Sequence, residues 1–358
     1  AVGMDSLAAN TSGNFNTAIG KAAGAVLNTG VNNTFVGGLA GDATDDGANN
    51  VAVGKSALSA NCSDSNTAVG AGSLAVSTGG ALVAVGKDAF TNLSTGASNV
   101  AVGFRAGAFA TTSDSSVFVG HQSGQGITGA KLTGNNNTCL GANAGLLLQG
   151  TANANTLMGS GAGDSLTTAI ENVLIGQSAG TDLVTGQRNT IIGNNAGANV
   201  TTSNNTFVGA NGASGGCGEA MTTGDANTIL GGYNGNQNSL DIRTASNNIV
   251  LSDGDGNPRA YFNGDSGFKV VGNAGPAGLT SKTDGLHEIV NNQGSANYSL
   301  RIASTSGSGN CFPLSVQYSG QAPNDATSRF ITCQDTVGSK FHVLSNGNVV
   351  NTNNSYGA

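Results

Sequence analysis

Few side chains in this sequence are of the types that bind metals. The three histidines, His121, His287 and His342, lie far apart and form no His-x-His or His-Glu-x-x-His pattern, so we expect surface or packing roles for them. The run Asp253-Gly254-Asp255-Gly256 is similar to the start of a calcium-binding loop but lacks the glutamate that closes such a loop. We interpret it as a turn, with a bound cation as the less favoured alternative. The sequence therefore predicts no metal site and no cofactor.

Groups that could act as catalysts are equally scarce. Asp45 and Asp46 lie among Gly and Asn, which is typical of a solvated turn, and acidic residues do not cluster near the C-terminus. Paired carboxylates that hydrolyse glycans need a separation of roughly 5–10 Å in a groove, which a sequence does not show. The five cysteines are odd in number and contain no Cys-x-x-Cys pair. We predict no catalytic residue and no enzyme activity; a glycan depolymerase is the alternative.

The composition excludes several classes of protein. Of the 358 residues, 58 are Gly, 9% are charged and none is Trp. Gly does not recur at every third position, so the chain is not a collagen, and no apolar run is long enough to span a membrane. The net charge of −7 argues against nucleic acid and anionic membranes as partners, because both need basic patches. A Gly- and Asn-rich repeat protein remains.

A five-residue motif, Asn-(Thr/Val)-apolar-apolar-Gly, recurs along the first two thirds of the chain. Its terminal glycines are mostly 16 or 17 residues apart. Ala1-Val2-Gly3 is the end of a further copy, so we expect more of the same protein upstream. The complete copies, some with Leu or Ser in place of the leading Asn, occupy residues 16–20, 33–37, 50–54, 66–70, 82–86, 99–103, 116–120, 137–141, 155–159, 172–176, 189–193, 205–209 and 227–231.

Each motif has the residues of a short β-strand. Thr or Val in its second position favours extended backbone, and the two apolar residues that follow point to opposite faces of a strand. Gly and Asn are suited to the corners between strands, where a positive φ is needed. We predict an all-β fold: a narrow parallel β-roll or β-solenoid of about 14 coils of 16–17 residues, roughly 65–70 Å long.

Both faces of these strands are apolar. One face fits the inside of a narrow coil, where small residues such as Ala18, Ala52 and Ala101 leave little space. The opposite face would form an apolar stripe along the whole rod, larger than a monomer normally exposes. Copies of the same chain are the simplest cover for this stripe. The repeat therefore predicts an obligate parallel homo-oligomer.

The motifs resemble two families of fibrous proteins. Asn-Thr-Ala-Ile-Gly at residues 16–20 and Asn-Val-Ala-Val-Gly at residues 50–54 resemble head repeats of trimeric autotransporter adhesins. The longer repeat, with Gly-x-x-Ala-Gly at residues 20–24 and 176–180, resembles repeats of bacteriophage tail fibres. The resemblance covers residues 1 to about 235 and implies a parallel homotrimer with a left-handed roll. The predicted trimer/coil core comprises Ile19, Val36, Val53, Val69, Val85, Val102, Val119, Leu140, Met158, Ile175, Ile192, Val208 and Leu230.

The composition changes near residue 236, since all four prolines lie beyond it and aromatic residues become more frequent. We predict a repeat rod over residues 1–236, a transition segment with a β-hairpin and a loop over 237–285, and a small C-terminal β tip domain over 286–358. A last, degenerate motif is expected at 248–251, and Asn346-Gly347 favours a hairpin turn. Strands are expected at residues 259–263, 299–303, 314–318, 329–332, 340–344 and 348–350.

The C-terminal end carries a second resemblance. Residues 341–351 and 354–358 resemble the segment that directly precedes the self-cleaving intramolecular chaperone of phage tail fibres and spikes. In that family the chaperone trimerises the fibre and then cuts itself off, which implies that Ala358 is the end left by the cut. Cys139 fills an apolar motif position and is predicted to be a small buried residue. Cys311 and Cys333 could meet, although a virion part assembled in a reducing cytoplasm normally keeps free thiols.

These patterns predict a structural and receptor-binding tail fibre, located in the virion, that attaches a bacteriophage to a bacterial surface. Its expected partners are itself, a host cell-surface glycan or protein, and other virion tail proteins upstream, with no nucleic acid and no membrane insertion. A trimeric adhesin on the bacterial cell surface is the alternative, and ice binding is a remote one. Turns such as the insertions before Asn137 and Asn227 are possible receptor contacts. Aromatic residues and Arg dominate binding hot spots. The candidate receptor contacts in the tip are therefore Tyr298, Phe312, Tyr318 and Arg329. Packing in the core of the tip is the simpler interpretation of these residues.

Overall fold

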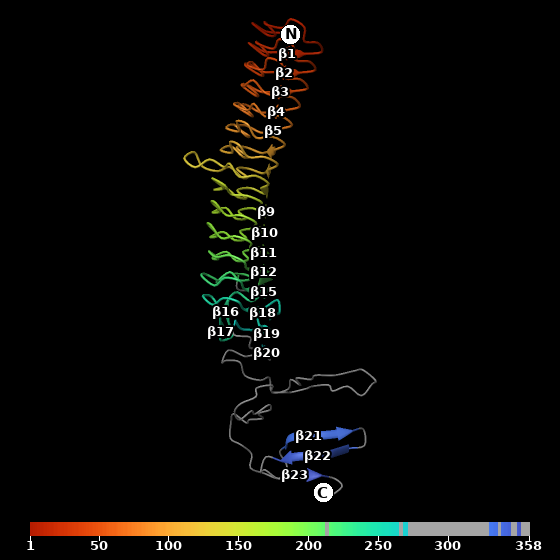
Figure 1. The fold of residues 1–358 in the computed structure, drawn as a ribbon, viewed down its shortest axis with the longest axis vertical. Helices are drawn as coiled ribbons and strands as arrows, with labels where there is room; N and C mark the ends of the chain where they lie inside the picture. Colours follow the sequence, from red (N-terminus) through yellow and green to blue (C-terminus); the bar gives the residue numbers. More distant parts are fainter. Residues whose placement is uncertain (212–214, 265–267, 271–328, 336–337, 345–348, 352–358) are drawn as a thin grey trace, which may run out of the picture. The chain divides into compact units, whose positions relative to one another are not determined.

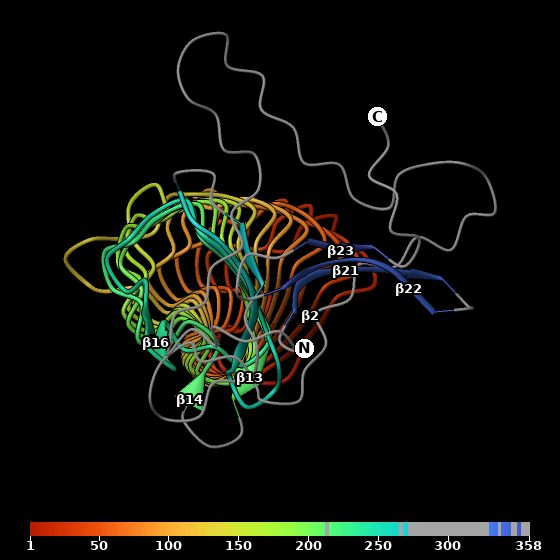
Figure 2. The same ribbon diagram turned by 90° about the horizontal axis from the view of Figure 1, so that it is seen from below.

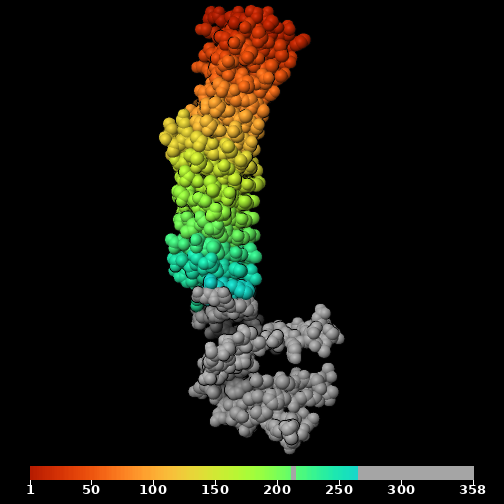
Figure 3. Space-filling view, in the orientation of Figure 1, coloured from red at the N-terminus to blue at the C-terminus, as the bar shows by residue number. Residues whose placement is uncertain are grey.

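The computed structural model describes residues 1–211, 215–264, 268–270, 329–335, 338–344 and 349–351. These residues are all β and include no helix, which confirms the predicted fold class. Two compact units are distinguished, Ala1–Gly285 and Leu286–Ala358, and each is described by itself. The described part of the first unit is a stack of narrow coils (Figures 1 and 3).

Each coil contributes one short strand to a continuous parallel sheet. Pairing is in register from motif to motif, so that Thr34 lies opposite Thr17 on one side and Val51 on the other. The predicted parallel β-solenoid of about 14 turns is thereby confirmed. The parallel strands are β1 (Thr17–Ile19), β2 (Thr34–Val36), β3 (Val51–Val53), β4 (Thr67–Val69), β5 (Val83–Val85), β6 (Val100–Val102), β7 (Val117–Val119), β8 (Thr138–Leu140), β9 (Thr156–Met158), β10 (Val173–Ile175), β11 (Thr190–Ile192), β12 (Thr206–Val208), β15 (Thr228–Leu230) and β18 (Ile249–Ser252).

The parallel ladder continues past residue 236. Strand β18 contains the degenerate motif and pairs in parallel with β15. The chain then reverses, since β19 (Pro258–Phe262) pairs antiparallel with β18, and β20 (Phe268–Val270) pairs antiparallel with β19. Two small hairpins lie before and after β15 in the chain: β13 (Ala210–Asn211) with β14 (Gly215–Gly216), and β16 (Asn236–Gln237) with β17 (Leu240–Asp241).

The glycine that ends each motif turns the chain out of its strand. At Gly103, φ is +138°, and a Cβ atom there would lie 2.3 Å from the carbonyl oxygen of Gly120 in the next coil. Gly20 has the same geometry, with φ of +134° and a Cβ position 2.5 Å from the carbonyl oxygen of Gly37. Both the backbone angle and the close stacking of coils therefore require glycine.

Other corners hold left-handed backbone at residues with side chains. The residue before each leading Asn is one of them, with φ of 60° at Asn32, 59° at Glu171 and 56° at Arg188. Asn tolerates this region, whereas Glu and Arg seldom adopt it. Hydrogen bonds between coils hold them there: the Glu171 N–H donates to the carbonyl oxygen of Asn153 at 3.0 Å. Stacking thus overrides local preference at these corners.

The leading asparagines form a ladder of buried hydrogen bonds. The Oδ1 atom of Asn172 accepts from the N–H of Asn189 in the next coil at 3.0 Å, and its Nδ2 atom donates to the carbonyl oxygen of Gly186 at 2.9 Å. Asn155 repeats this pattern with Asn172 as its partner. The ladder is interrupted where a buried Leu82 occupies the Asn position. In most coils the Asn side chain therefore satisfies buried backbone groups through both of its polar atoms; at Asn50 only Oδ1 does so, by accepting from the N–H of Asn66, and the buried Nδ2 has no hydrogen-bond partner.

The middle residue of each strand fills the coil interior. This residue is fully buried in every parallel strand. In several coils its size is balanced by the residue six positions later. Where the strand centre is Ala52, the later residue is Leu58; where the centre is Phe118, the later residue is Gly124, and a Cβ there would lie 2.2 Å from the Phe118 ring. Large and small residues exchange places between the two positions in these coils. Where both are small, as at Ala101 and Gly107, the rings of Phe90 and Phe118 from the adjacent coils lie against the glycine. The narrow interior is thus kept close-packed.

Insertions lie outside the stack and leave the ladder intact. Between β7 and β8 the spacing grows to 21 residues, and the extra chain projects beyond the outline of the coils (yellow in Figures 1 and 2). Ile127 and Ala130 form an antiparallel bridge within it. A Cβ atom at Gly129 would meet nothing within 4 Å. Val117 and Thr138 nevertheless remain opposite each other in the sheet.

The second unit contains a three-stranded antiparallel sheet among its described residues. Its strands are β21 (Arg329–Asp335), β22 (Gly338–Leu344) and β23 (Val349–Asn351), which confirms the strands expected at 329–332, 340–344 and 348–350. The antiparallel pairing of β22 with β23 is what a turn at Asn346-Gly347 predicts, although those two residues lie outside the described ranges. The strands expected at 299–303 and 314–318 also lie outside them.

Candidate functional site

The outer strand face consists of the first and third residues of β1 to β12 and β15. Their side chains point away from the coil interior and are half-buried or exposed in a single chain. The third residue is 46% exposed at Ile19, 43% at Leu140 and 41% at Leu230. In-register pairing places all the third residues in one aliphatic column and the Thr and Val residues in another. The face is a continuous, largely apolar stripe of the kind that marks an interaction surface.

The residues predicted to form the trimer/coil core are the third residues of this face. They lie on the outside of their own coil, so they do not belong to its interior, which is formed by middle residues such as Phe35 and Leu174. The middle residues Ala18, Ala52 and Ala101, which the sequence places inside the coil, are fully buried. The role of the third residues as contacts between chains stays a prediction.

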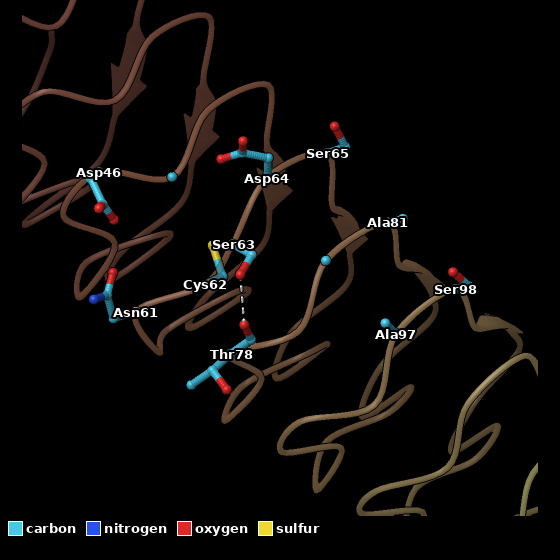
Figure 4. A pocket seen from close by; sticks show the side chains of 12 residues that line it. Asp46, Asn61, Cys62, Ser63, Asp64, Ser65, Thr78, Ala81, Ala97 and Ser98 are labelled. Carbon is cyan, nitrogen blue, oxygen red and sulfur yellow. Dashed lines mark hydrogen bonds between the residues drawn. The ribbon is translucent and has the colours of Figure 1, made fainter.

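A polar groove opens on the side of the stack at the corners that precede β3 to β6 (Figure 4). It has a volume of about 890 Å³. It lies where the ladder spacing shortens to 16 residues and where small residues occupy successive corners. Its polar lining includes Asp46, Asn61, Ser63, Asp64, Ser65, Thr78 and Ser98.

Much of the polar lining of this groove is already hydrogen-bonded within the chain. Oδ1 of Asp64 accepts from the N–H of Ala48 at 2.8 Å, and the Ser63 hydroxyl donates to the carbonyl oxygen of Thr78 at 3.0 Å. No aromatic side chain lines the groove, so it lacks the flat platform on which sugars stack. Its lining offers hydroxyl, amide and carboxylate groups and no apolar platform.

Buried titratable groups in the coils are packing groups. The cysteines of the coils, Cys62, Cys139 and Cys217, are free and buried. Burial raises the pKa of all three, that of Cys217 to about 12, and a thiol held neutral in this way is a poor nucleophile. Burial also raises the pKa of Tyr233, whose hydroxyl donates to the carbonyl oxygen of Leu240 at 2.7 Å.

The segment 253–256 forms a turn, as expected. Oδ1 of Asp253 accepts from the N–H of Asp255 at 3.1 Å and from that of Asn257 at 2.8 Å, and the carboxylate pairs with Arg259. Burial opposes ionisation of Asp253, but the hydrogen bonds from Asn257 and Arg259 outweigh it and lower the pKa of this carboxyl. No cluster of three or more His, Cys, Asp or Glu side chains that could hold a metal ion occurs in the described part of the chain.

The structure places only some of the other residues singled out by the sequence. His121 is exposed and stacks on Phe104, with 5.4 Å between the ring centroids. His342 lies in β22, Cys333 lies in β21 and Arg329 begins β21. The candidate receptor contacts of the tip therefore stay predictions. Outside the described residues lie His287, Tyr298, Cys311, Phe312, Tyr318 and Ala358.

Comparison with known proteins adds no relative. No protein-family model matches the chain, and neither a curated protein nor a solved structure matches it. No helix long and apolar enough to cross a membrane occurs among the residues that the structure describes. Function therefore has to be inferred from the geometry of the coils and from the sequence motifs.

Proposed function

We propose that this chain is a structural and receptor-binding tail fibre protein of a bacteriophage, which attaches the virion to the bacterial surface as a parallel homotrimer. The observation that carries the proposal is the outer strand face, an apolar stripe that a single chain leaves uncovered. The resemblance of the repeats to trimeric head domains and of the C-terminus to a chaperone-proximal segment supports an assembly of three chains.

The regularity of the face suits contact between identical chains. Ile175 and Ile192 are neighbours in the aliphatic column, and Val173 and Thr190 are neighbours in the column beside it. Because every coil rises by the same strand spacing of about 4.8 Å, a contact made at one coil recurs at the next. Parallel copies of the chain can therefore bury their outer strand faces against one another along the whole stack.

Such an assembly would act as a long, stiff support and as a multivalent binder. A stack whose coils are joined by an in-register ladder and by buried Asn side chains is stiff. It would hold a tip away from the virion and present three copies of that tip to a surface carrying many identical receptors. Three weak contacts made together bind far more tightly than one. The receptor would be a host glycan or protein, and tail proteins upstream would anchor the fibre.

Light scattering on the purified chain tests the trimer. We expect three times the 34.9-kDa mass of one chain. Ile175→Asp places a charge on the outer strand face and should dissociate the trimer. Gln177→Asp is the matched control, because Gln177 is exposed two residues beyond the end of β10 and should leave the mass unchanged. A folded wild-type monomer in native buffer would contradict the proposal.

Antibodies against the chain distinguish the two biological settings. Gold labelling of phage tails by electron microscopy, and competition between the purified trimer and phage for adsorption to cells, are the results expected for a tail fibre. Labelling of the surface of uninfected bacteria would support a trimeric adhesin instead. Shortening of a host polysaccharide by the trimer would support a fibre-borne depolymerase.

A further inference from the structure

A row of side chains runs along the stack, one position after the glycine of each motif. Adjacent members lie in adjacent coils. The carbonyl oxygen of Lys21 accepts from the N–H of Leu39 at 2.9 Å, and that of Lys87 accepts from the N–H of Arg105 at 3.0 Å. The row thus follows the stack two residues beyond the outer strand face. We call the part of this row that follows the first seven complete motifs the basic row; in chain order it comprises Lys21, Gly38, Lys55, Ala71, Lys87, Phe104 and His121.

This row concentrates positive charge on an acidic chain. The net charge is −7, yet three of the basic residues between positions 1 and 236 belong to the row and a fourth, Arg105, is next to it. Lys21 and Lys55 are exposed, and the side chain of Lys87 is 65% exposed. The one ion pair that the row makes among the described residues joins Lys87 Nζ to Asp88 Oδ2 at 3.5 Å. All Lys and Arg residues of this part are Lys21, Lys55, Lys87, Arg105, Lys131 and Arg188.

Small residues separate the lysines of the row. Gly38 and Ala71 occupy the intervening coils, so successive lysines are attached two coils apart, about 9–10 Å along the stack. A hollow of about 380 Å³ lies between Lys21 and Lys55. Leu39 lines this hollow and is 40% exposed, which gives it an apolar floor.

An aromatic cluster lies at the other end of the row. Phe104 is 38% exposed and stacks on His121 with 23° between the ring planes. Lys87 Nζ lies 5.8 Å and Arg105 Cζ lies 5.5 Å from the Phe104 ring centroid. These cation–π contacts hold the two cations in place, and Arg105 has no carboxylate partner among the described residues. The cluster therefore offers fixed positive charge beside an exposed ring.

We infer that the basic row binds an acidic linear polysaccharide through the carboxylates of its sugars. Arg and Lys pair with carboxylates by charge-assisted hydrogen bonds, while Leu39 and Phe104 offer apolar surface to the C–H faces of sugar rings. The spacing of the lysines suits a polymer whose charge recurs once per disaccharide. Contacts repeated along a straight row add up to tight binding although each is weak.

The same features disfavour nucleic acid as the occupant. Duplex DNA carries one charge per roughly 1.7 Å of its axis, which is far denser than one lysine in every second coil. The overall negative charge of the chain also repels a polymer that is uniformly and densely negative. A sparsely charged glycan can contact the lysines of the row and is repelled less by the acidic residues elsewhere on the chain.

Binding of hyaluronate, a linear polysaccharide with one carboxylate per disaccharide, to the full chain tests the inference. Titration calorimetry would compare wild type with Lys21→Gln/Lys55→Gln and with Lys131→Gln/Arg188→Gln, a control that removes the same charge from exposed sites outside the row. We expect the row variant to lose about tenfold or more in affinity and the control less than about twofold. Phe104→Ala should also weaken binding, and neutral dextran should not bind.

Four results would overturn the inference: no binding of hyaluronate by wild type, equal losses in both double variants, equally tight binding of duplex DNA, or a change of oligomeric mass confined to the row variant. The last result would place the lysines between chains. The inference stands on the row alone and not on the fibre proposal. If the polysaccharide does not bind, the adsorption and labelling experiments can still support a tail fibre. If those experiments fail, the calorimetry can still show binding to the row.

Discussion

Replacing Asn172 by Ala should weaken the stack more than its small size implies. In the folded chain, Oδ1 of Asn172 accepts from the N–H of Asn189, and Nδ2 donates to the carbonyl oxygen of Gly186. Asn172 and Asn189 are almost completely buried. The alanine variant would leave the Asn189 N–H and the Gly186 carbonyl without these partners, in a place where the coils on both sides exclude water.

The expected loss follows from these two backbone groups. A buried donor or acceptor left without a partner costs about 1–3 kcal/mol, so two of them predict a fall in the free energy of unfolding of about 2–6 kcal/mol. The deleted side-chain volume adds a smaller cavity cost. Because coils contact only their neighbours, the damage should be concentrated between β10 and β11 rather than spread along the rod.

Urea unfolding followed by circular dichroism would measure the total loss, and hydrogen exchange with mass spectrometry would locate it in the peptide that contains Asn189. Asn194→Ala is the matched control, since Asn194 is exposed and makes one long hydrogen bond to Gln177 at 3.4 Å. It should change stability by less than about 0.5 kcal/mol. The reasoning is refuted if Asn172→Ala is as mild as this control, or if exchange at Asn189 is unchanged.

Three further outcomes are expected. Gly103→Ala should destabilise by about 3 kcal/mol or more because of its φ of +138° and the close carbonyl, whereas Gly38→Ala, whose Cβ would meet nothing nearer than 3.9 Å, should be nearly neutral in thermal unfolding. Leu58→Gly should destabilise by about 2–4 kcal/mol, because emptying the coil interior costs more than glycine gains at the left-handed φ of 56°; adding Ala52→Leu should recover part of this loss, and no recovery would contradict the size balance. The stabilising effect of a neutral Cys217 is fully present below the ordinary thiol pKa and is lost as the pH rises toward about 12, so urea titrations at rising pH should show a decline that Cys217→Ala reduces.

The repeat made most of the rod predictable. A motif that returns at a nearly fixed spacing supplies the strand, its partners and its register together, because one coil determines all the others. The degenerate motif of β18 was predictable for the same reason. The size balance between Ala52 and Leu58 was not, since it appears only when two segments of one coil are placed face to face.

The left-handed corners show where local preference fails as a guide. Gly and Asn indicate such corners, yet Leu74, Phe90 and Arg105 adopt the same backbone with φ of 49°, 48° and 53°. A non-glycine residue there carries a cost of about 1–3 kcal/mol, which hydrogen bonds to adjacent coils offset. Those bonds join residues in different repeats, and sequence propensities do not describe them.

The basic row was missed at the sequence level because its members are far apart in the chain. Lys21 and Lys55 belong to alternate repeats, and nothing in the intervening sequence marks them as neighbours. Aligning the repeats on their terminal glycines would have placed them in one column.

Because the register is uniform, the length of the stack can change without a change in the structure of each coil. Removing residues 172–188 would join Glu171 to Asn189, and Glu171 has the same left-handed backbone as Arg188, which it would replace. Strand β9 would then meet β11 with the pairing it now makes with β10. Recombination between repeats can therefore shorten or lengthen the chain by whole coils while both ends keep their structure. The number of coils therefore sets the length of the stack.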